Sequence, residues 1–417
     1  MKKNNKIGLS SFLKLDIVLI IIFLAIPMVN YLNYVLRGAN TTFIVFMFWL
    51  ILVLSKKKSL GIIINGLKKR KVALFFIILF ILISFFNYFF VRTTNKALNY
   101  SIHSIYFILI LVIDTYYTYR NKDLKFIILA GIILVLGVQA IISIPYILSN
   151  NFLLIRELSS GQLSKWQEIE AFRNGLGNNG LYSSLGAISL LGLSSLNKFS
   201  FLLKILMIVC ILSLIFTIFL STFFASIFLF LLGCIILMFR HFKLNLEFKQ
   251  LIFLTFLSFT IFYFYDNFVS DTRFLDPIYD KIERFSEGET TSRDQLMLVS
   301  WNTFSQNPFF GVGVPENGSQ DIVGEHAPWI DFLAFFGFLG FLPLLIFYFN
   351  LIFKNLKYFI KHNSLMDTAC LSGIVIFVIS NFISPMFVVP TMYSFLILFF
   401  TSPLDLEINS DSRKAMD

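Results

Sequence analysis

Long apolar segments, separated by short polar ones, make up most of this 417-residue chain. Crossing about 30 Å of hydrocarbon takes roughly 20 apolar residues in a helix, and the segments have lengths near that value. The pattern predicts an all-α polytopic membrane protein with about twelve transmembrane helices, forming one integral-membrane domain over 1–417. The predicted spans are 16–36, 40–55, 72–91, 101–119, 125–148, 181–197, 200–220, 222–240, 248–265, 328–353, 367–388 and 390–403.

Two boundaries in this pattern need interpretation. The apolar run of 41 residues over 200–240 is too long for one span, and the polar pair Ser221-Thr222 divides it, which predicts a tight hairpin. At the N-terminus, Lys2, Lys3 and Lys6 precede the first apolar segment, as in a signal peptide. No small-residue cleavage site follows, so we expect the first helix to be retained.

Composition agrees with a membrane location. Hydrophobic residues form 57% of the chain and charged residues only 14%, whereas soluble domains contain about 25% charged residues. Cys210, Cys234 and Cys370 all fall inside apolar runs, so we expect no disulfide framework. No spacing of Cys and His indicates a metal site.

The positive charge follows the connecting segments in a regular way. With the N-terminus inside, the segments predicted on the inner side hold 24 of the 34 Lys and Arg residues, and every one of them is basic. The net charge of +10 is therefore explained as a topogenic signal, and no nucleic-acid partner is implied. Both termini are predicted to be cytoplasmic.

Two predicted outer loops, 149–180 and 266–327, are much longer than the others, and loops of this length usually carry function. In the second loop, Pro277 to Phe285 has helical spacing that suits a membrane surface. Ser292 and Gln295 form a capping-box pattern for a helix that would end near Asn307-Pro308. Gly311 and Gly313 then allow a tight return of the backbone.

His326 is the main candidate for chemistry. Pro328 suits the first turn of a helix, which would place His326 at that helix N-terminus. The helix dipole there favours a neutral imidazole, which is the form a general base requires. Glu325 and Asp331 are near enough in sequence to orient the ring. The plain alternative is a solvated histidine in an outer loop.

Arginines in the two outer loops are candidate phosphate contacts, because a guanidinium can bind phosphate oxygens in a forked geometry. The candidates are Arg173 and Arg293, with Arg273 and Arg284 as weaker ones. A solvated or headgroup-facing side chain is the alternative for each. Three further features are interpreted as structural: His103 as a packed side chain, Asp114 as a residue that reaches the interface, and the Gly337 and Gly340 pair as a site of close helix packing.

These residues together resemble the O-antigen polymerase and O-antigen ligase superfamily. His326, with Gly337 and Gly340 at their spacing, is similar to the family signature. The run from Arg293 through Trp301 to Pro308-Phe309-Phe310-Gly311-Val312-Gly313 resembles the segment that precedes the family histidine. Arg173-Asn174-Gly175 and the residues that follow resemble a motif of the earlier outer loop.

The resemblance implies a GT-C-like glycosyltransferase of the bacterial cytoplasmic membrane. Its donor would be an oligosaccharide repeat unit on undecaprenyl diphosphate, its acceptor a sugar hydroxyl, and the transfer inverting and independent of metal or other cofactors. His326 would act as base, Arg173 and Arg293 would contact the diphosphate, and Arg284, Arg273, Glu325 and Asp331 would contribute to substrate binding. Expected partners are membrane lipid, a chain-length regulator and a flippase.

Three other functions are alternatives for a polytopic membrane protein. A ligase of the same family would move the finished glycan to another acceptor, and the local motifs do not separate it from a polymerase. A flippase or transporter would place charged residues along a path within the spans and would show inverted repeats. The charges gather instead in the two outer loops, which favours an enzyme, and the expected enzyme is a polymerase that builds a surface polysaccharide. A channel would need a filter-like sequence, which we do not find.

Overall fold

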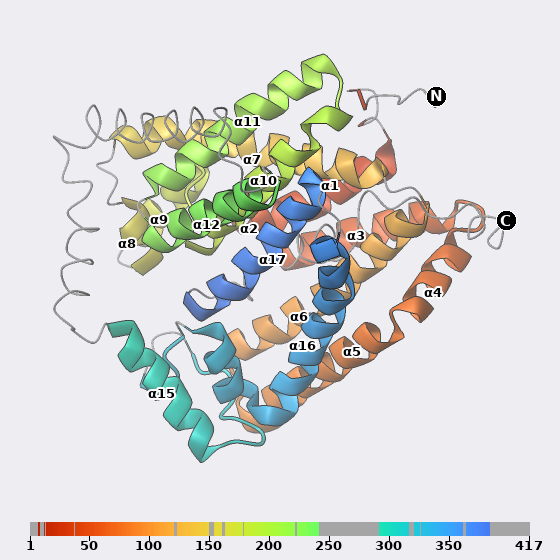
Figure 1. The fold of residues 1–417 in the computed structure, drawn as a ribbon. Helices are drawn as coiled ribbons and strands as arrows, with labels where there is room; N and C mark the ends of the chain where they lie inside the picture. The colour runs from red at the N-terminus through yellow and green to blue at the C-terminus, as the bar shows by residue number, and fades with distance from the viewer. Residues whose placement is uncertain are drawn as a thin grey trace.

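The computed structural model describes residues 7–8, 12, 14–36, 38–120, 123–149, 154–160, 163–177, 179–221, 223–241, 292–316, 321–325, 327–361 and 364–383. Within them the fold is helical, and an isolated bridge between Ile7 and Phe199 is the only β-type pairing (Figure 1). The elements are α1 (Leu15–Met28), α2 (Asn30–Val35), α3 (Gly38–Leu54), α4 (Ser59–Lys69), α5 (Lys71–Phe86), the π-helix η2 (Asn87–Val91), α6 (Asn95–Arg120), α7 (Asp123–Ser149), α8 (Leu154–Ser160), α9 (Lys165–Arg173), α10 (Asn179–Ser195), the 3-10 turn η3 (Leu196–Lys198), α11 (Phe201–Leu220), α12 (Phe224–His241), α15 (Ser292–Gln306), α16 (Pro328–Lys361) and α17 (Leu365–Ile383).

Six stretches in the described part of the chain are long and apolar enough to cross a membrane. They also expose large apolar side chains. Phe75 and Leu82 on α5, Phe201 and Leu212 on α11 and Phe353 on α16 are each more than half exposed. Extended apolar surface of this kind suits lipid and not water. The chain is therefore an all-α membrane protein, as its apolar pattern predicts.

Ten of the predicted apolar segments coincide with helices, whereas 248–265 and 390–403 lie outside the described residues. The first segment differs from the prediction, because it is two helices. The chain leaves helical geometry at Val29, two residues after Pro27 inside α1, and resumes as the short α2. The predicted division of the long apolar run near Ser221 is confirmed. The two helices on either side do not pack mainly on each other, because α11 packs mainly on α7 and α10, while α12 packs mainly on α17 and α10.

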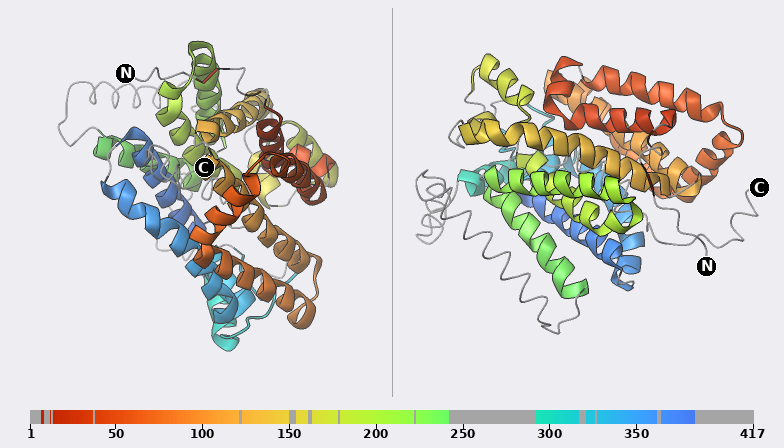
Figure 2. Two further views of the ribbon diagram at one scale, coloured as in Figure 1. Left: turned by 90° about the vertical axis from the view of Figure 1, so that its right-hand side faces the viewer. Right: turned by 90° about the horizontal axis from the view of Figure 1, so that it is seen from above.

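The bundle is assembled around α7 and α10. Seen from above, α7 runs between the N-terminal pair α1 and α3 and the helices α10 and α11 (Figure 2). α16 packs on α5, α15 and α17, and α5 packs on α6. Small polar side chains join neighbouring helices, such as Ser84 Oγ and Ser101 Oγ at 2.9 Å, as is common between helices in a membrane.

The segments that connect the helices lie at two opposite ends of the bundle. α4 lies at one end, and α8, α9 and α15 lie at the other (Figure 1). We call these the α4 end and the α15 end. At the α4 end, segments predicted on the inner side contact one another, since Ile7 N donates to Lys198 O at 3.0 Å and Lys56 pairs with Asp16 at 2.8 Å.

Segments predicted on the outer side likewise meet at the α15 end. Thr94 Oγ1 donates to Val314 O at 2.8 Å, and Asn30, inside the first predicted span, donates through Nδ2 to Leu176 O of the first outer loop at 3.1 Å. The two predicted sets of loops are thus separated at opposite ends of the bundle.

Asp114 does not reach the surface of the protein, which corrects the sequence interpretation. Its side chain is fully buried and forms ion pairs with Arg70, at the start of α5, and with Lys125 of α7, which is 1% exposed. Thr118 Oγ1 also donates to Asp114 Oδ1 at 3.2 Å. A buried carboxylate needs compensating charge, and Arg70 and Lys125 supply it here. The sequence alone does not show that the helices carrying these residues are adjacent.

Candidate functional site

The site begins with a break in α16. Gly337 has φ 61° and ψ −169°, so the helix stops and restarts within the predicted span. Only glycine adopts this conformation readily. The break leaves carbonyl and N–H groups without helical partners, and at membrane depth such groups are tolerated only where protein or a water-filled cavity satisfies them.

The segment after α15 supplies those partners. Val312 N donates to Ala334 O at 2.9 Å, and Gly313 N donates to Phe335 O at 3.0 Å. In the reverse direction, Phe338 N donates to Pro308 O at 2.8 Å. The Pro308–Gly313 run is therefore docked, backbone to backbone, into the broken helix.

Glycine is required at each point of this contact. A Cβ at Gly311 would lie 2.4 Å from Phe335 O, and one at Gly337 would lie 2.3 Å from the carbonyl group of Phe309. Gly311 and Gly313 have φ 69° and 75°, which confirms the predicted tight return. The interpretation of Gly337 as a helix-packing residue is wrong, whereas Gly340 does approach α5, where an added Cβ would lie 3.1 Å from Ile83 Cγ2.

The junction between α5 and α6 holds the same segment from the other side. Asn87, in the π-helix η2, donates through Nδ2 to Phe310 O at 3.2 Å and to Phe335 O at 3.3 Å. Asn95 N donates to Glu316 Oε1 at 3.1 Å. π-helical turns often occur at functional sites. Here the turn places the Asn87 side chain where it bonds both to the docked segment, at Phe310 O, and to the broken helix, at Phe335 O.

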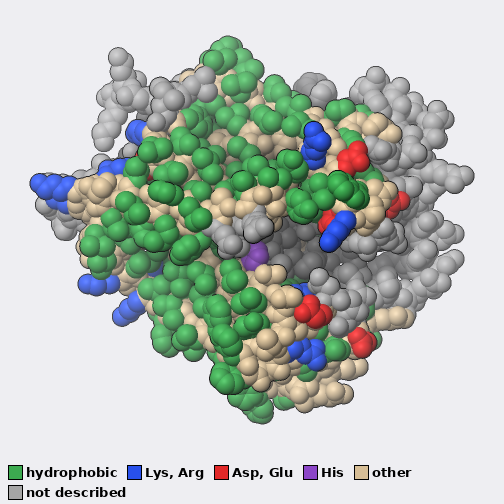
Figure 3. All heavy atoms as spheres, turned by 180° about the vertical axis from the view of Figure 1, so that it is seen from behind, with side chains coloured by type: hydrophobic (Ala, Val, Ile, Leu, Met, Phe, Trp, Pro, Cys, Tyr) green, Lys and Arg blue, Asp and Glu red, His purple; other side chains and the backbone are tan. Residues whose placement is uncertain are grey.

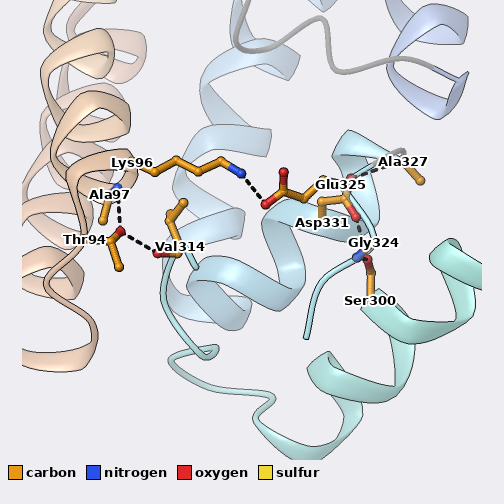
Figure 4. A network of polar contacts seen from close by, with 9 residues as sticks. All are labelled: Thr94, Lys96, Ala97, Ser300, Val314, Gly324, Glu325, Ala327 and Asp331. Atoms are coloured by element: carbon orange, nitrogen blue, oxygen red, sulfur yellow. Dashed lines mark hydrogen bonds and ion pairs between the residues drawn. The ribbon is translucent and has the colours of Figure 1, made fainter. Parts of the chain in front are cut away.

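A second polar network fixes the chain on either side of position 326 (Figure 4). Asp331 accepts from Ser300 Oγ at 2.6 Å and from Ala327 N at 2.8 Å, and Gly324 N donates to Ser300 Oγ at 2.9 Å. Figure 4 also shows Lys96 reaching from α6 to an ion pair with Glu325. Glu325 has φ 60°, a left-handed backbone that is uncommon outside glycine.

A cavity of about 330 Å³ lies between α5, α6 and α16 beside this network. It is lined by Phe80, Asn95, Lys96, Asn99, Tyr100, His103, Ser104, Phe107, Glu316, Phe332 and Leu344. Figure 3 shows a mostly hydrophobic face of the molecule, with a histidine near its middle and acidic and basic side chains to one side of it. The cavity combines aromatic walls with a few polar groups, which is typical of small-ligand sites.

The predicted site residues are placed as follows. His326, Arg273 and Arg284 lie outside the described residues. Arg293 is the second residue of α15, whose start at Ser292 and end at Gln306 confirm the predicted helix. Arg173 is exposed at the C-terminal end of α9. The described partners of Asp331 are Ser300 and Ala327, and that of Glu325 is Lys96.

The loop after Arg173 is anchored to the bundle. Gly175 has φ 80°, and its carbonyl accepts from Gln139 Nε2 of α7 at 3.0 Å. A Cβ at Gly175 would lie 2.8 Å from Gln139 O, so the close approach of this backbone serves packing on α7. Arg173 is thus held at the α15 end of the bundle, and it is not among the described residues that line the cavity.

Two residues of the cavity were missed by sequence reasoning. Lys96 is not among the predicted site residues, and the sequence interpretation of His103 is a packed side chain. Lys96 and His103 are seven residues apart, which puts them on one face of a helix. This spacing is the feature of the sequence that could have indicated a shared site. Within the described ranges, no three His, Cys, Asp or Glu side chains are arranged to hold a metal ion, and metal independence stays a prediction.

The segments that carry the resemblance are structural units at this site. Pro308–Gly313 is the docked backbone, Gly337 is the helix break, and α16 begins at Pro328 as predicted. No protein-family model matches the chain, and no curated protein matches it at a significant level.

Proposed function

We propose that this protein is a glycosyltransferase that joins lipid-diphosphate-linked oligosaccharide repeat units into a surface polysaccharide. The observation that supports it best is the docking of Pro308–Gly313 into the broken helix α16, beside a cavity at the α15 end of a membrane bundle. This arrangement holds the chain on both sides of position 326 next to a space open to a ligand. It suits a substrate whose lipid lies in the membrane and whose sugars lie outside.

The reaction follows from the residue types. The acceptor hydroxyl oxygen forms a bond to the anomeric carbon of the donor sugar while the bond from that carbon to the diphosphate oxygen breaks. His326 takes the hydroxyl proton as general base. The leaving lipid diphosphate gains negative charge, which Arg173 and Arg293 stabilise, with Arg273 and Arg284 as further contacts. Attack opposite the leaving group inverts the configuration at the anomeric carbon.

The proposal includes a specific placement in the cell. The chain crosses the bacterial cytoplasmic membrane twelve times in a GT-C-like arrangement, with both termini and the α4 end in the cytoplasm. The excess of Lys and Arg in the segments of the α4 end supports this orientation. The α15 end then faces the side on which undecaprenyl-diphosphate-linked glycans are assembled, where a flippase would deliver them and a regulator would set chain length.

A flippase or transporter is less well supported. It needs polar groups along a continuous path between the two surfaces. Among the described spans, the buried Asp114 cluster lies at the α4 end, and the cavity with Lys96 and His103 lies toward the α15 end. That separation favours chemistry at one surface.

The test is purified protein in proteoliposomes with a defined undecaprenyl-diphosphate-linked repeat unit and EDTA. We expect longer lipid-linked products from the wild type. His326→Ala and Arg293→Ala should reduce chain extension at least about 100-fold, because each removes a group that acts on the transition state.

Lys58→Ala, an exposed residue at the α4 end, is the control and should polymerise at near the wild-type rate. Long polymer from both the His326 and Arg293 variants would show that the site is misassigned. Transfer of preformed glycan to a different acceptor, with no extension of the lipid-linked chain, would identify a ligase.

A further inference from the structure

The cavity between α5, α6 and α16 has no role in the reaction steps assigned to His326, Arg173 and Arg293. It is nevertheless built as a binding site, because aromatic and polar side chains enclose a volume of about 330 Å³. It lies beside the Lys96–Glu325 ion pair, and Glu325 directly precedes the proposed base, His326, in sequence. What it binds can be argued from its walls and its charge.

The walls are aromatic and well packed. Phe80 and Phe332 stack with ring centroids 6.3 Å apart, and Tyr100 lies 5.9 Å from Phe332. Phe107 extends the same wall deeper, where its ring packs edge-on against Phe347. Such a wall offers flat apolar surface for one side of a ring-shaped ligand.

Polar groups from α6 face the same space. Asn95, Asn99, His103 and Ser104 line the cavity within three turns of one helix. The Nδ1 atom of His103 is buried and has no hydrogen-bond partner among the described residues. A buried polar atom without a partner is energetically costly, so its presence at a cavity points to a ligand that satisfies it.

The charge of the cavity argues against phosphate. Lys96 is its cation, and that ammonium is already paired with Glu325. Glu316 adds a second carboxylate at the rim, where it accepts from Asn95 N at 3.1 Å. With two carboxylates beside one ammonium, the cavity has no surplus of positive charge for a diphosphate. A neutral ligand rich in hydroxyl groups suits it better.

The depth of the cavity restricts the ligand further. Lys96 and His103 are seven residues apart on α6, which is about 10 Å along the helix axis. The cavity therefore extends from the start of α6 into the membrane-spanning part. Of the sugars in a lipid-linked glycan, the one joined to the lipid diphosphate is the one that lies at this level.

From these observations we infer that the cavity is a subsite for one sugar ring of the lipid-linked glycan, the ring joined to the diphosphate. The ring lies against Tyr100 and Phe332, and its hydroxyl groups bond to Asn99 and to Nδ1 of His103. This inference rests on the proposed function, since it names the part of that substrate held between α5, α6 and α16. His103 is a binding residue in this scheme and takes no part in proton transfer.

The test compares the kinetics of His103→Phe and Asn99→Leu with wild type in the proteoliposome assay. Each variant removes hydrogen bonds to the sugar, so KM for the lipid-linked unit should rise about tenfold while kcat changes less than about threefold. His103→Gln keeps a hydrogen-bonding side chain and should restore most of the affinity. Asn302→Leu, an exposed change on α15, is the matched control and should leave both constants unchanged.

A second measurement does not need turnover. Saturation-transfer NMR with free glucose, galactose, rhamnose and N-acetylglucosamine should detect binding of at least one sugar to wild type and lose it in His103→Phe. Wild-type KM in both His103→Phe and Asn99→Leu, or a fall in kcat with KM unchanged, would overturn the subsite.

Failure of wild type to make polymer, with sugar binding that depends on His103, would overturn the proposed function and keep the subsite. Sugar binding that is equal in wild type and His103→Phe would overturn the subsite whatever the polymerisation result.

Discussion

At the scale of single residues, the glycines of this chain have different structural roles, which their sequence context does not reveal. Gly311, Gly313 and Gly337 are needed because two backbones meet where a Cβ would overlap main-chain or neighbouring atoms. Gly61 in α4, by contrast, faces open space. The motif glycines are therefore structural: they let an outer segment complete the hydrogen bonds of a broken membrane helix.

Gly337→Ala tests this reading. The added methyl group would lie 2.3 Å from the carbonyl group of Phe309, in a conformation with φ 61° that alanine does not favour. We expect a loss of about 1–3 kcal/mol in the free energy of unfolding and a clear fall in the thermal midpoint of the purified protein. Gly61→Ala should leave the midpoint unchanged or slightly raised, because alanine favours helix more than glycine does. Equal midpoints for the two variants would show that the contact does not constrain position 337.

At the scale of elements, the α4 end is held by an ion cluster and not by apolar packing alone. Asp114 of α6 joins Arg70, between α4 and α5, to Lys125 of α7. Burying these charges is costly, so each depends on the others. The cluster thereby sets the relative positions of α5, α6 and α7 at the end opposite the cavity.

Asp114→Asn should expose that dependence. It removes the carboxylate that pairs with Arg70 and with the nearly inaccessible Lys125, and we expect a destabilisation of about 3–5 kcal/mol. Thermal unfolding monitored by size-exclusion chromatography would measure it. Glu168→Gln on α9 removes an exposed carboxylate and serves as the control, with a midpoint near that of wild type. If the two changes had the same small effect, the cluster would not hold the helices together.

At the scale of the whole molecule, the loops separate into two sets at opposite ends of the bundle (Figure 1). The basic segments meet at the α4 end, while α9, α15 and the docked backbone lie at the α15 end. The proposed function needs the α15 end to face outward, away from the cytoplasm.

Labelling of single cysteines checks the orientation. In a background with Cys210, Cys234 and Cys370 replaced by serine, Trp166→Cys on α9 and Leu60→Cys on α4 introduce thiols at positions that are 83% and 56% exposed. A membrane-impermeant maleimide applied to spheroplasts should label position 166, and should label position 60 only after permeabilisation. The reverse pattern would invert the topology and exclude the proposed function.

Much of the site scaffold could be predicted from local signals. The start of α15 at Ser292, its end before Asn307, the return at Gly311 and Gly313 and the start of α16 at Pro328 all follow from capping and turn chemistry. The partners of these segments could not be predicted. Nothing near Asn87 or Thr94 in sequence indicates that each donates to a carbonyl more than 200 residues away.

By itself, the sequence determined the class of the protein, the helices and the separation of its loops, because hydrophobic length, basic residues and helix caps act over short stretches of chain. Only the tertiary structure decided that Gly337 breaks a helix, that Asp114 is buried in an ion cluster and that His103 lines a cavity with Lys96. These depend on which helices become neighbours, and that is set by the summed packing of many side chains, which no single motif encodes.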